Sequence, residues 1–157
     1  MNKFLWTVLL IAASFGIANA QTKKVNLLEK DIGGLHFIYT KIIDIDKAKT
    51  SYMLTMSFKS AENSKAAGIK TITLNSDDGC RQFTKDLTNA ITQMDANEDV
   101  DMSWDRKNYS LAVMEEQKGV YLYNENKEGY IVLNKKNSDK LLNLINRISF
   151  GSDEISQ

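Results

Sequence analysis

The 157-residue chain contains no proline, one cysteine and one histidine, and each scarcity narrows its chemistry. Without proline, the turns must form at glycine, asparagine and aspartate. A single cysteine, Cys80, excludes an internal disulfide framework and any metal site built from several thiolates. A single histidine, His36, excludes metal sites that need several imidazoles. We therefore expect no cofactor and no metal site.

An excess of charge of either sign is also missing. The chain has 20 Lys+Arg and 20 Asp+Glu, so it lacks the electrostatic footprint of a protein that binds nucleic acid or an anionic membrane surface. Its 43% hydrophobic and 25% charged residues are typical of a globular protein. Nucleic acid is therefore a disfavoured partner.

Residues 1–20 have the pattern of a secretion signal. Lys3 gives a positive start, an apolar stretch follows from Phe4 to Ile17, and the small residues Ala18 and Ala20 precede the expected cleavage. The apolar run is shorter than the roughly 20 residues of a membrane span, so an uncleaved anchor is the less favoured alternative. We expect export to the periplasm or the extracellular space, with no transmembrane segment in the mature chain.

The remaining sequence is interpreted as a single α+β domain over 21–150, followed by a polar, frayed tail over 151–157. Alternating apolar residues predict strands over 25–31, 35–46, 52–59 and 69–74, and then strands that start near residues 100, 109, 120 and 130. A three- and four-residue apolar period predicts a helix over 77–95, capped by Ser76 or Asp77. A second helix with Leu141, Leu144 and Ile145 is expected to be capped by Ser138 and Asp139.

The two junctions between strand and helix resemble each other. Ile72-Thr73-Leu74-Asn75 precedes the first helix and Ile131-Val132-Leu133-Asn134 precedes the second. Four strands and a helix, twice over, indicate an antiparallel sheet with two helices and a tandem ββββα duplication, the alternative being chance recurrence. This element order resembles the Whirly type of single-stranded nucleic-acid-binding fold, although the sequence carries no family motif. The resemblance implies nucleic-acid binding. The export signal and the neutral net charge differ from what is expected of such a protein.

Few residues have the spacing of a catalytic or metal site. The acidic turn from Asp95 to Asp101 alternates oxygen ligands, but Val100 and Arg106 replace the glycine and the glutamate that a calcium-binding EF-hand loop needs. Cys80 lies near a helix N-terminus, which can lower a thiol pKa, and a catalytic pair with His36 would need the two to meet in space. Phosphate-binding, dinucleotide-binding, serine-hydrolase and zinc-protease motifs are missing. We therefore expect no enzyme, with a carboxylate-based hydrolase as an alternative.

Tyrosines provide the more specific signal. Tyr121 and Tyr123 share one face of a predicted strand, and Tyr109 and Tyr130 lie on strands expected to flank it. If Val120 and Leu122 face the helices, these four tyrosines form an aromatic patch on the open side of the sheet that could contact a ligand or partner. The alternative is that aromatic pairs across strands simply stabilise the sheet.

Together these patterns favour a small, exported, non-enzymatic binding protein with a protein or glycan partner. A single-stranded nucleic-acid-binding protein and a carboxylate-based hydrolase are the alternatives. Long strands without proline also permit a homodimer that pairs through strand edges.

Overall fold

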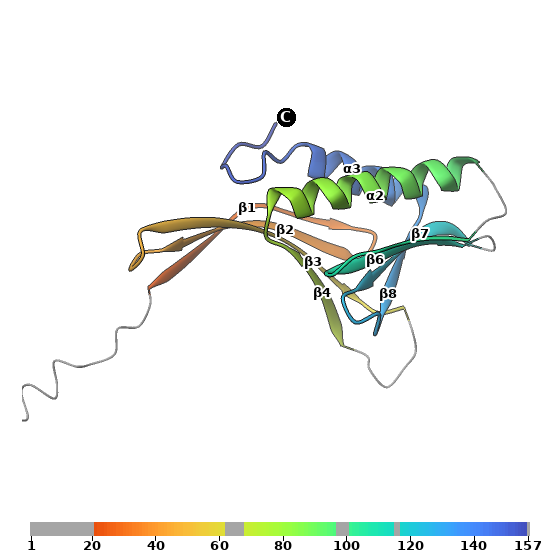
Figure 1. Ribbon diagram of the computed structural model, residues 1–157, viewed down its shortest axis with the longest axis horizontal. Helices are drawn as coiled ribbons and strands as arrows, with labels where there is room; N and C mark the ends of the chain where they lie inside the picture. The colour runs from red at the N-terminus through yellow and green to blue at the C-terminus, as the bar shows by residue number, and fades with distance from the viewer. Residues whose placement is uncertain (1–20, 62–67, 97–100, 115–116, 157) are drawn as a thin grey trace, which may run out of the picture.

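Two four-stranded antiparallel sheets, each followed by a helix, make up the fold (Figure 1). The computed structural model describes residues 21–61, 68–96, 101–114 and 117–156, so the predicted signal lies outside the described residues. The first sheet contains β1 (Thr22–Ile32), β2 (Leu35–Asp44), β3 (Lys49–Lys59) and β4 (Ile69–Leu74), and α2 (Asp77–Ala96) follows it. The second sheet contains β5 (Met102–Asp105), β6 (Tyr109–Met114), β7 (Gln117–Asn124) and β8 (Tyr130–Leu133), and α3 (Lys135–Asn146) follows it. The predicted α+β class and the repeated ββββα order are confirmed, whereas the resemblance to the Whirly fold stays a prediction.

Sequence alternation explains how each sheet acquires a buried and an open face. In β2, Leu35, Phe37 and Tyr39 are buried, while Ile38 and Ile42 on the other face are only half-buried. Because β2 pairs with both β1 and β3, it is an inner strand, as its apolar residues on both faces predicted.

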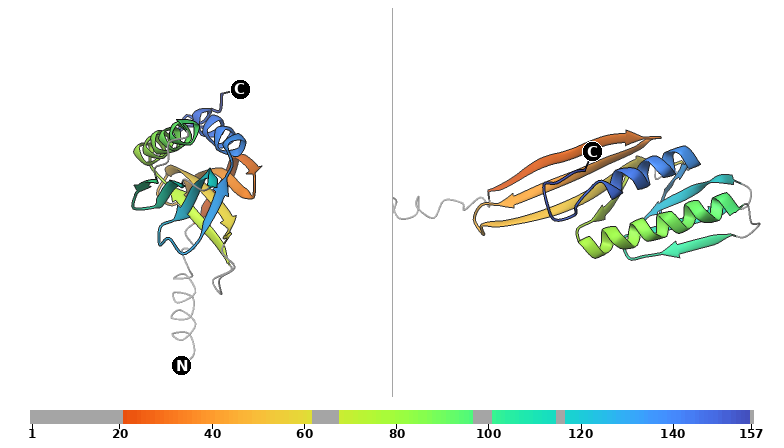
Figure 2. Two further views of the ribbon diagram at one scale, coloured as in Figure 1. Left: turned by 90° about the vertical axis from the view of Figure 1, so that its right-hand side faces the viewer. Right: turned by 90° about the horizontal axis from the view of Figure 1, so that it is seen from above.

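Both helices lie on the same side of the two sheets (Figure 2). Ser76 Oγ accepts a hydrogen bond from the backbone N–H of Gly79, so Ser76 caps α2 as expected. The predicted cap of the second helix was wrong. Asn134 caps α3 by accepting from the N–H of Asn137, and Ser138 is already inside the helix, where its hydroxyl donates to the carbonyl of Leu133.

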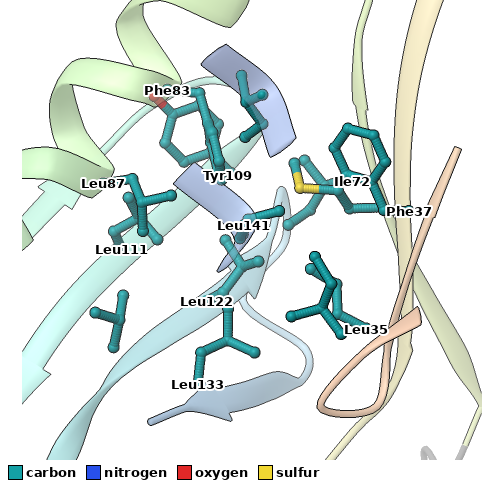
Figure 3. Packing of buried hydrophobic residues seen from close by; sticks show 14 of the residues in the cluster. Leu35, Phe37, Ile72, Phe83, Leu87, Tyr109, Leu111, Leu122, Leu133 and Leu141 are labelled. Atoms are coloured by element: carbon teal, nitrogen blue, oxygen red, sulfur yellow. The ribbon is translucent and has the colours of Figure 1, made fainter. Parts of the chain in front are cut away.

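One hydrophobic core joins the two sheets and the two helices. Figure 3 shows Leu35, Phe37 and Ile72 of the first sheet facing Leu122 and Leu133 of the second. Helix α2 closes the core from above with Phe83 and Leu87, and α3 adds Leu141. The helix-facing side of the second sheet is thereby filled, which leaves its other side as the open one.

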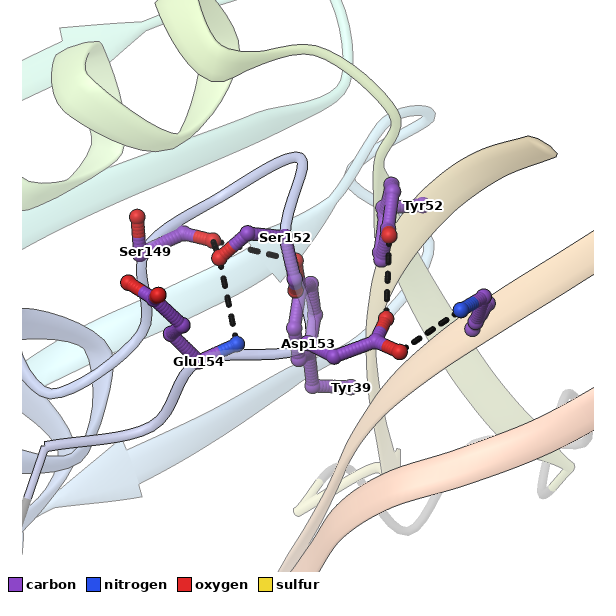
Figure 4. A network of polar contacts seen from close by, with 7 residues as sticks. Tyr39, Tyr52, Ser149, Ser152, Asp153 and Glu154 are labelled. Carbon is purple, nitrogen blue, oxygen red and sulfur yellow. Dashed lines mark hydrogen bonds and ion pairs between the residues drawn. The ribbon is translucent and has the colours of Figure 1, made fainter.

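The C-terminal segment 147–156 is held against β2 and β3, in contrast to the predicted frayed tail (Figure 4). The hydroxyl of Tyr39 donates to the carbonyl of Ser152 over 3.0 Å and accepts from the N–H of Gly151 over 3.0 Å. Asp153 accepts from Lys41 over 2.6 Å and from the hydroxyl of Tyr52 over 2.9 Å. These contacts order the segment although its composition is polar.

Candidate functional site

Three of the four predicted tyrosines gather on one face of the second sheet. Tyr121 and Tyr123 of β7 project away from the helices, because Leu122 between them is buried in the core. Tyr123 is paired with Tyr130 of β8. The ring centroids of Tyr121 and Tyr123 are 6.4 Å apart, and each lies 5.4 Å from that of Tyr130. We call this side of the sheet, with Tyr121, Tyr123 and Tyr130, the tyrosine face.

Exposure differs among these rings. Tyr121 is 3% exposed, whereas Tyr123 and Tyr130 are half-buried. The tyrosine face therefore offers two accessible rings supported by a third.

Tyr109 is not part of this face, which corrects the predicted four-tyrosine patch. The register pairs Leu111 with Leu122 and Tyr109 with Asn124, so Tyr109 projects to the helix side. Its ring packs edge-on against Phe83 with centroids 4.8 Å apart. The sequence already indicated this orientation, because the period of two places Tyr109 on the same face of the strand as Leu111 and Val113.

The hydroxyl of Tyr109 belongs instead to a buried polar cluster around Asp86 of α2. Asp86 accepts from Tyr109 over 2.8 Å and from the guanidinium of Arg106 over 2.7 and 2.8 Å. Gln82 donates a fourth hydrogen bond over 2.9 Å. Burial raises the pKa of Asp86, but the hydrogen bonds from Arg106, Tyr109 and Gln82 outweigh burial and hold the pKa below its ordinary value. Four hydrogen bonds thus satisfy the carboxylate of Asp86, and its ion pair with Arg106 has a structural role.

A cavity of about 260 Å3 lies on the tyrosine face beside Tyr123. Its lining combines an aromatic ring with hydroxyl and charged groups: Ser103, Asp105, Ser110, Leu111, Ala112, Tyr123 and Lys127. Asp105 and Lys127 form an ion pair of 2.8 Å. Sequence reasoning missed Ser103, Asp105 and Ser110, because their position beside Tyr123 depends on the register between strands.

Cys80 and His36 do not form a pair. Cys80 is buried on the helix side and lines a cavity of about 350 Å3 together with Ile145, Ile148 and Phe150. His36 lies on the opposite face of β2 from the buried Leu35 and Phe37. Burial raises the pKa of the Cys80 thiol to about 12, which overrides the lowering expected at a helix N-terminus. Cys80 is thus a free, neutral thiol.

His36 forms contacts with two carboxylates of the neighbouring strand β1. Its Nδ1 lies 2.7 Å from Asp31 and its Nε2 lies 3.3 Å from Glu29. The hydrogen bond with Asp31 is the main cause of a pKa above the ordinary value. This exposed cluster links the two strands of a hairpin.

The candidate calcium turn falls largely outside the described residues, since 97–100 are not among them. Asp95, at its start, forms an ion pair with Lys135 over 2.7 Å. Within the described ranges, no three histidine, cysteine, aspartate or glutamate side chains come together as metal ligands.

Comparison with known proteins yields no match, either to a protein-family model or to a curated protein. Neither described helix is long and apolar enough to cross a membrane.

Proposed function

We propose that this chain is an exported, non-enzymatic binding protein that contacts its ligand or partner with the tyrosine face. The gathering of Tyr121, Tyr123 and Tyr130 on the helix-free side of the second sheet is the observation that carries this proposal. Tyrosine suits such a role because its ring supplies contact area and its hydroxyl stays compatible with water. The pattern of residues 1–20 supports export.

The charged residues near the tyrosine face favour an uncharged ligand or partner and disfavour nucleic acid. Lys127 is paired with Asp105, and Lys70 lies 3.4 Å from Glu128. A surface that follows a phosphate backbone needs an excess of cations, and these lysines are matched by carboxylates. The ion pairs therefore favour a neutral ligand or partner surface.

The proposal is tested by capture with and without the accessible rings. The chain from Gln21 onward is immobilised and exposed to an envelope extract that has been separated into protein and polysaccharide fractions. Captured components are identified, purified and rebound to wild type, Tyr123→Ala and Tyr130→Ala. Ile69→Ala is the control, because Ile69 is 78% exposed and lies on the first sheet.

We expect a purified component to bind wild type and the control equally, and to bind both tyrosine variants roughly tenfold more weakly, or about 1.4 kcal/mol. Binding that is equal in all four proteins would place the contact elsewhere on the molecule and overturn the proposal.

A further inference from the structure

A groove follows β6 across the tyrosine face. The register aligns Asp105, Ser110, Tyr123 and Tyr130 in one row across the four strands. The adjacent row of the same face contains Ser103, Ala112, Tyr121 and Val132. In both rows the β6 residue is small and its neighbour on β7 is a tyrosine, so β6 is the floor and β7 is a wall. The polar residues of β5 form the opposite wall.

The aromatic wall presents a supported ring to the groove. The planes of Tyr123 and Tyr121 are inclined by only 19°, and Tyr130 packs against both. Since its neighbours restrict its rotation, Tyr123 loses little conformational entropy when a ligand binds. A flat, partly exposed ring of this kind suits the C–H-bearing face of a saturated ring.

The opposite wall is polar but electrically balanced. The hydrogen bond with Lys127 is the main cause of a lowered pKa for Asp105, and the hydroxyl of Ser110 adds to the effect. Asp105 is therefore an anionic hydrogen-bond acceptor at neutral pH, and Lys127 cancels its charge. Ser103 adds an exposed hydroxyl that can both donate and accept.

Together, the aromatic wall and the polar wall indicate which class of ligand fits the groove. An aromatic ring on one side with a carboxylate and hydroxyls on the other matches a molecule that has an apolar ring face and several hydroxyl edges. The matched charges favour neither a phosphate nor a cation. A cavity of about 260 Å3 has room for one sugar ring and is smaller than most drug-sized pockets.

We propose that the groove beside Tyr123 is a subsite for a neutral saccharide, with the sugar ring stacked on Tyr123 and its hydroxyls bonded to Asp105 and Ser103. The inference rests on the proposed function, because it names the ligand class of the same face. A peptide or protein surface that contacts Tyr123 is the competing occupant, which the experiment must separate.

The test uses neutral tetrasaccharides of glucose, N-acetylglucosamine, galactose and mannose, titrated calorimetrically into the chain from Gln21 onward. Ser103→Phe fills the groove from β5 without altering a tyrosine, and Asp105→Asn removes the charged acceptor while keeping its shape. Met102→Phe is the matched control, because it adds the same side chain one residue away on the opposite side of β5, where Met102 is 40% exposed. Thermal unfolding of each variant verifies its fold.

We expect at least one saccharide to bind wild type and Met102→Phe, with at least a roughly tenfold loss in Ser103→Phe and a several-fold loss in Asp105→Asn. No binding of any tetrasaccharide by wild type, or binding that Ser103→Phe leaves unchanged, would overturn the inference. In either case, a captured protein whose binding still depends on Tyr123 would leave the proposed function standing. A failure of the proposed function itself is recognised separately, by the equal behaviour of Tyr123→Ala and wild type in the capture experiment.

Discussion

Among the described residues, Asp86 is the charged side chain that the core buries completely. It is 1% exposed, and two hydrogen bonds from Arg106, one from Tyr109 and one from Gln82 satisfy its oxygens. A buried carboxylate is costly unless it is fully paired, and removal of one partner leaves the other charge or hydroxyl unsatisfied. Asp86 therefore fixes the position of α2 on the second sheet.

Substitution of Asp86 tests this role. We expect Asp86→Ala to lower the free energy of unfolding by about 2–4 kcal/mol at pH 7, because it leaves the buried hydroxyl of Tyr109 without its acceptor and removes the ion pair of Arg106, whose side chain water can partly hydrate. Tyr109→Phe, which removes one donor, should cost about 1–2 kcal/mol. Urea unfolding monitored by circular dichroism measures both. A cost of Asp86→Ala no larger than that of Tyr109→Phe would contradict the assignment.

The same carboxylate predicts an acid-dependent loss of stability. Because the pKa of Asp86 is lowered from its ordinary 3.8 in the folded state, its contribution is present above that value and is lost as the pH falls through the lowered one. We expect wild type to lose more stability than Asp86→Asn below about pH 4. Urea midpoints at several pH values provide the comparison, and parallel curves would exclude this linkage.

His36 gives a second titration prediction, opposite in sign. Its pKa is raised above 6.5, so its pairing with Asp31 stabilises the fold fully below 6.5 and fades as the pH rises through the raised value. Since His36 is the one histidine of the chain, its ring protons can be followed without ambiguity by NMR. Asp31→Asn should shift the pKa down towards 6.5, and Glu29→Gln should shift it less. An Asp31→Asn pKa equal to that of wild type would show that the hydrogen bond does not set it.

At the scale of elements, the C-terminal segment 147–156 packs against the first sheet and lines a cavity. Phe150 packs against Tyr39 with ring centroids 5.8 Å apart and lines the cavity that contains Cys80. Asp153 anchors the segment to Lys41 and Tyr52. Because Phe150 and Cys80 line the same cavity, we expect the segment to restrict access to the thiol.

Thiol labelling measures this shielding. Wild-type Cys80 should react slowly with a thiol reagent at neutral pH, because it is buried and its pKa is about 12. Phe150→Ala should accelerate the reaction at least roughly tenfold and cost about 1–3 kcal/mol of stability, since Phe150 is partly buried. Asp153→Asn, which weakens only the anchor, should have a smaller effect. Ile69→Ala serves as the control, and equal rates in all four proteins would mean that the segment does not cover the thiol.

The elements that sequence predicts well are those with local periodicity. Apolar residues on both faces predicted β2 as an inner strand of its sheet, and the apolar period of Phe83, Leu87 and Ile91 predicted α2. The order of the C-terminal segment could not be predicted, because Tyr39 and Ser152 are 113 positions apart in the chain. The composition of the groove could not be predicted for a different reason: Asp105 and Ser110 are close in the chain, but only the exact strand register places them side by side. Local pattern determines which face a residue takes, whereas register and tertiary contacts determine its neighbours.

At the scale of the molecule, the two ββββα halves interlock. Helix α2 follows the first sheet in the chain, yet Phe83 and Asp86 on its buried face contact Tyr109 of the second sheet. Side chains from both sheets and both helices form one core cluster (Figure 3). Each half therefore buries part of its apolar surface against the other, and α2 packs on β6 and β7 of the second sheet.

The edge strand β1 is where a second copy of the chain could pair with the first sheet. Strand β1 is an edge strand of 11 residues, and its register shifts between Asn26 and Leu28. Such an irregularity, together with the lysines of this strand, disfavours pairing with a second copy. The strand-edge homodimer stays a prediction, and size-exclusion chromatography with light scattering distinguishes it from a monomer.

Because the two ββββα halves share one core, we predict that neither half folds on its own. The intact chain should unfold in one cooperative transition that near- and far-ultraviolet circular dichroism report at the same urea concentration. Fragments 21–96 and 101–157, produced alone, should show poorly dispersed amide NMR spectra, because α2 would expose the face that packs on the second sheet. Mixed in equal amounts, they should recover native-like dispersion as a one-to-one complex, since the missing surface is then supplied by the partner fragment. A well-dispersed spectrum from either fragment alone, or two separate transitions in the intact chain, would show instead that each ββββα unit is an autonomous domain.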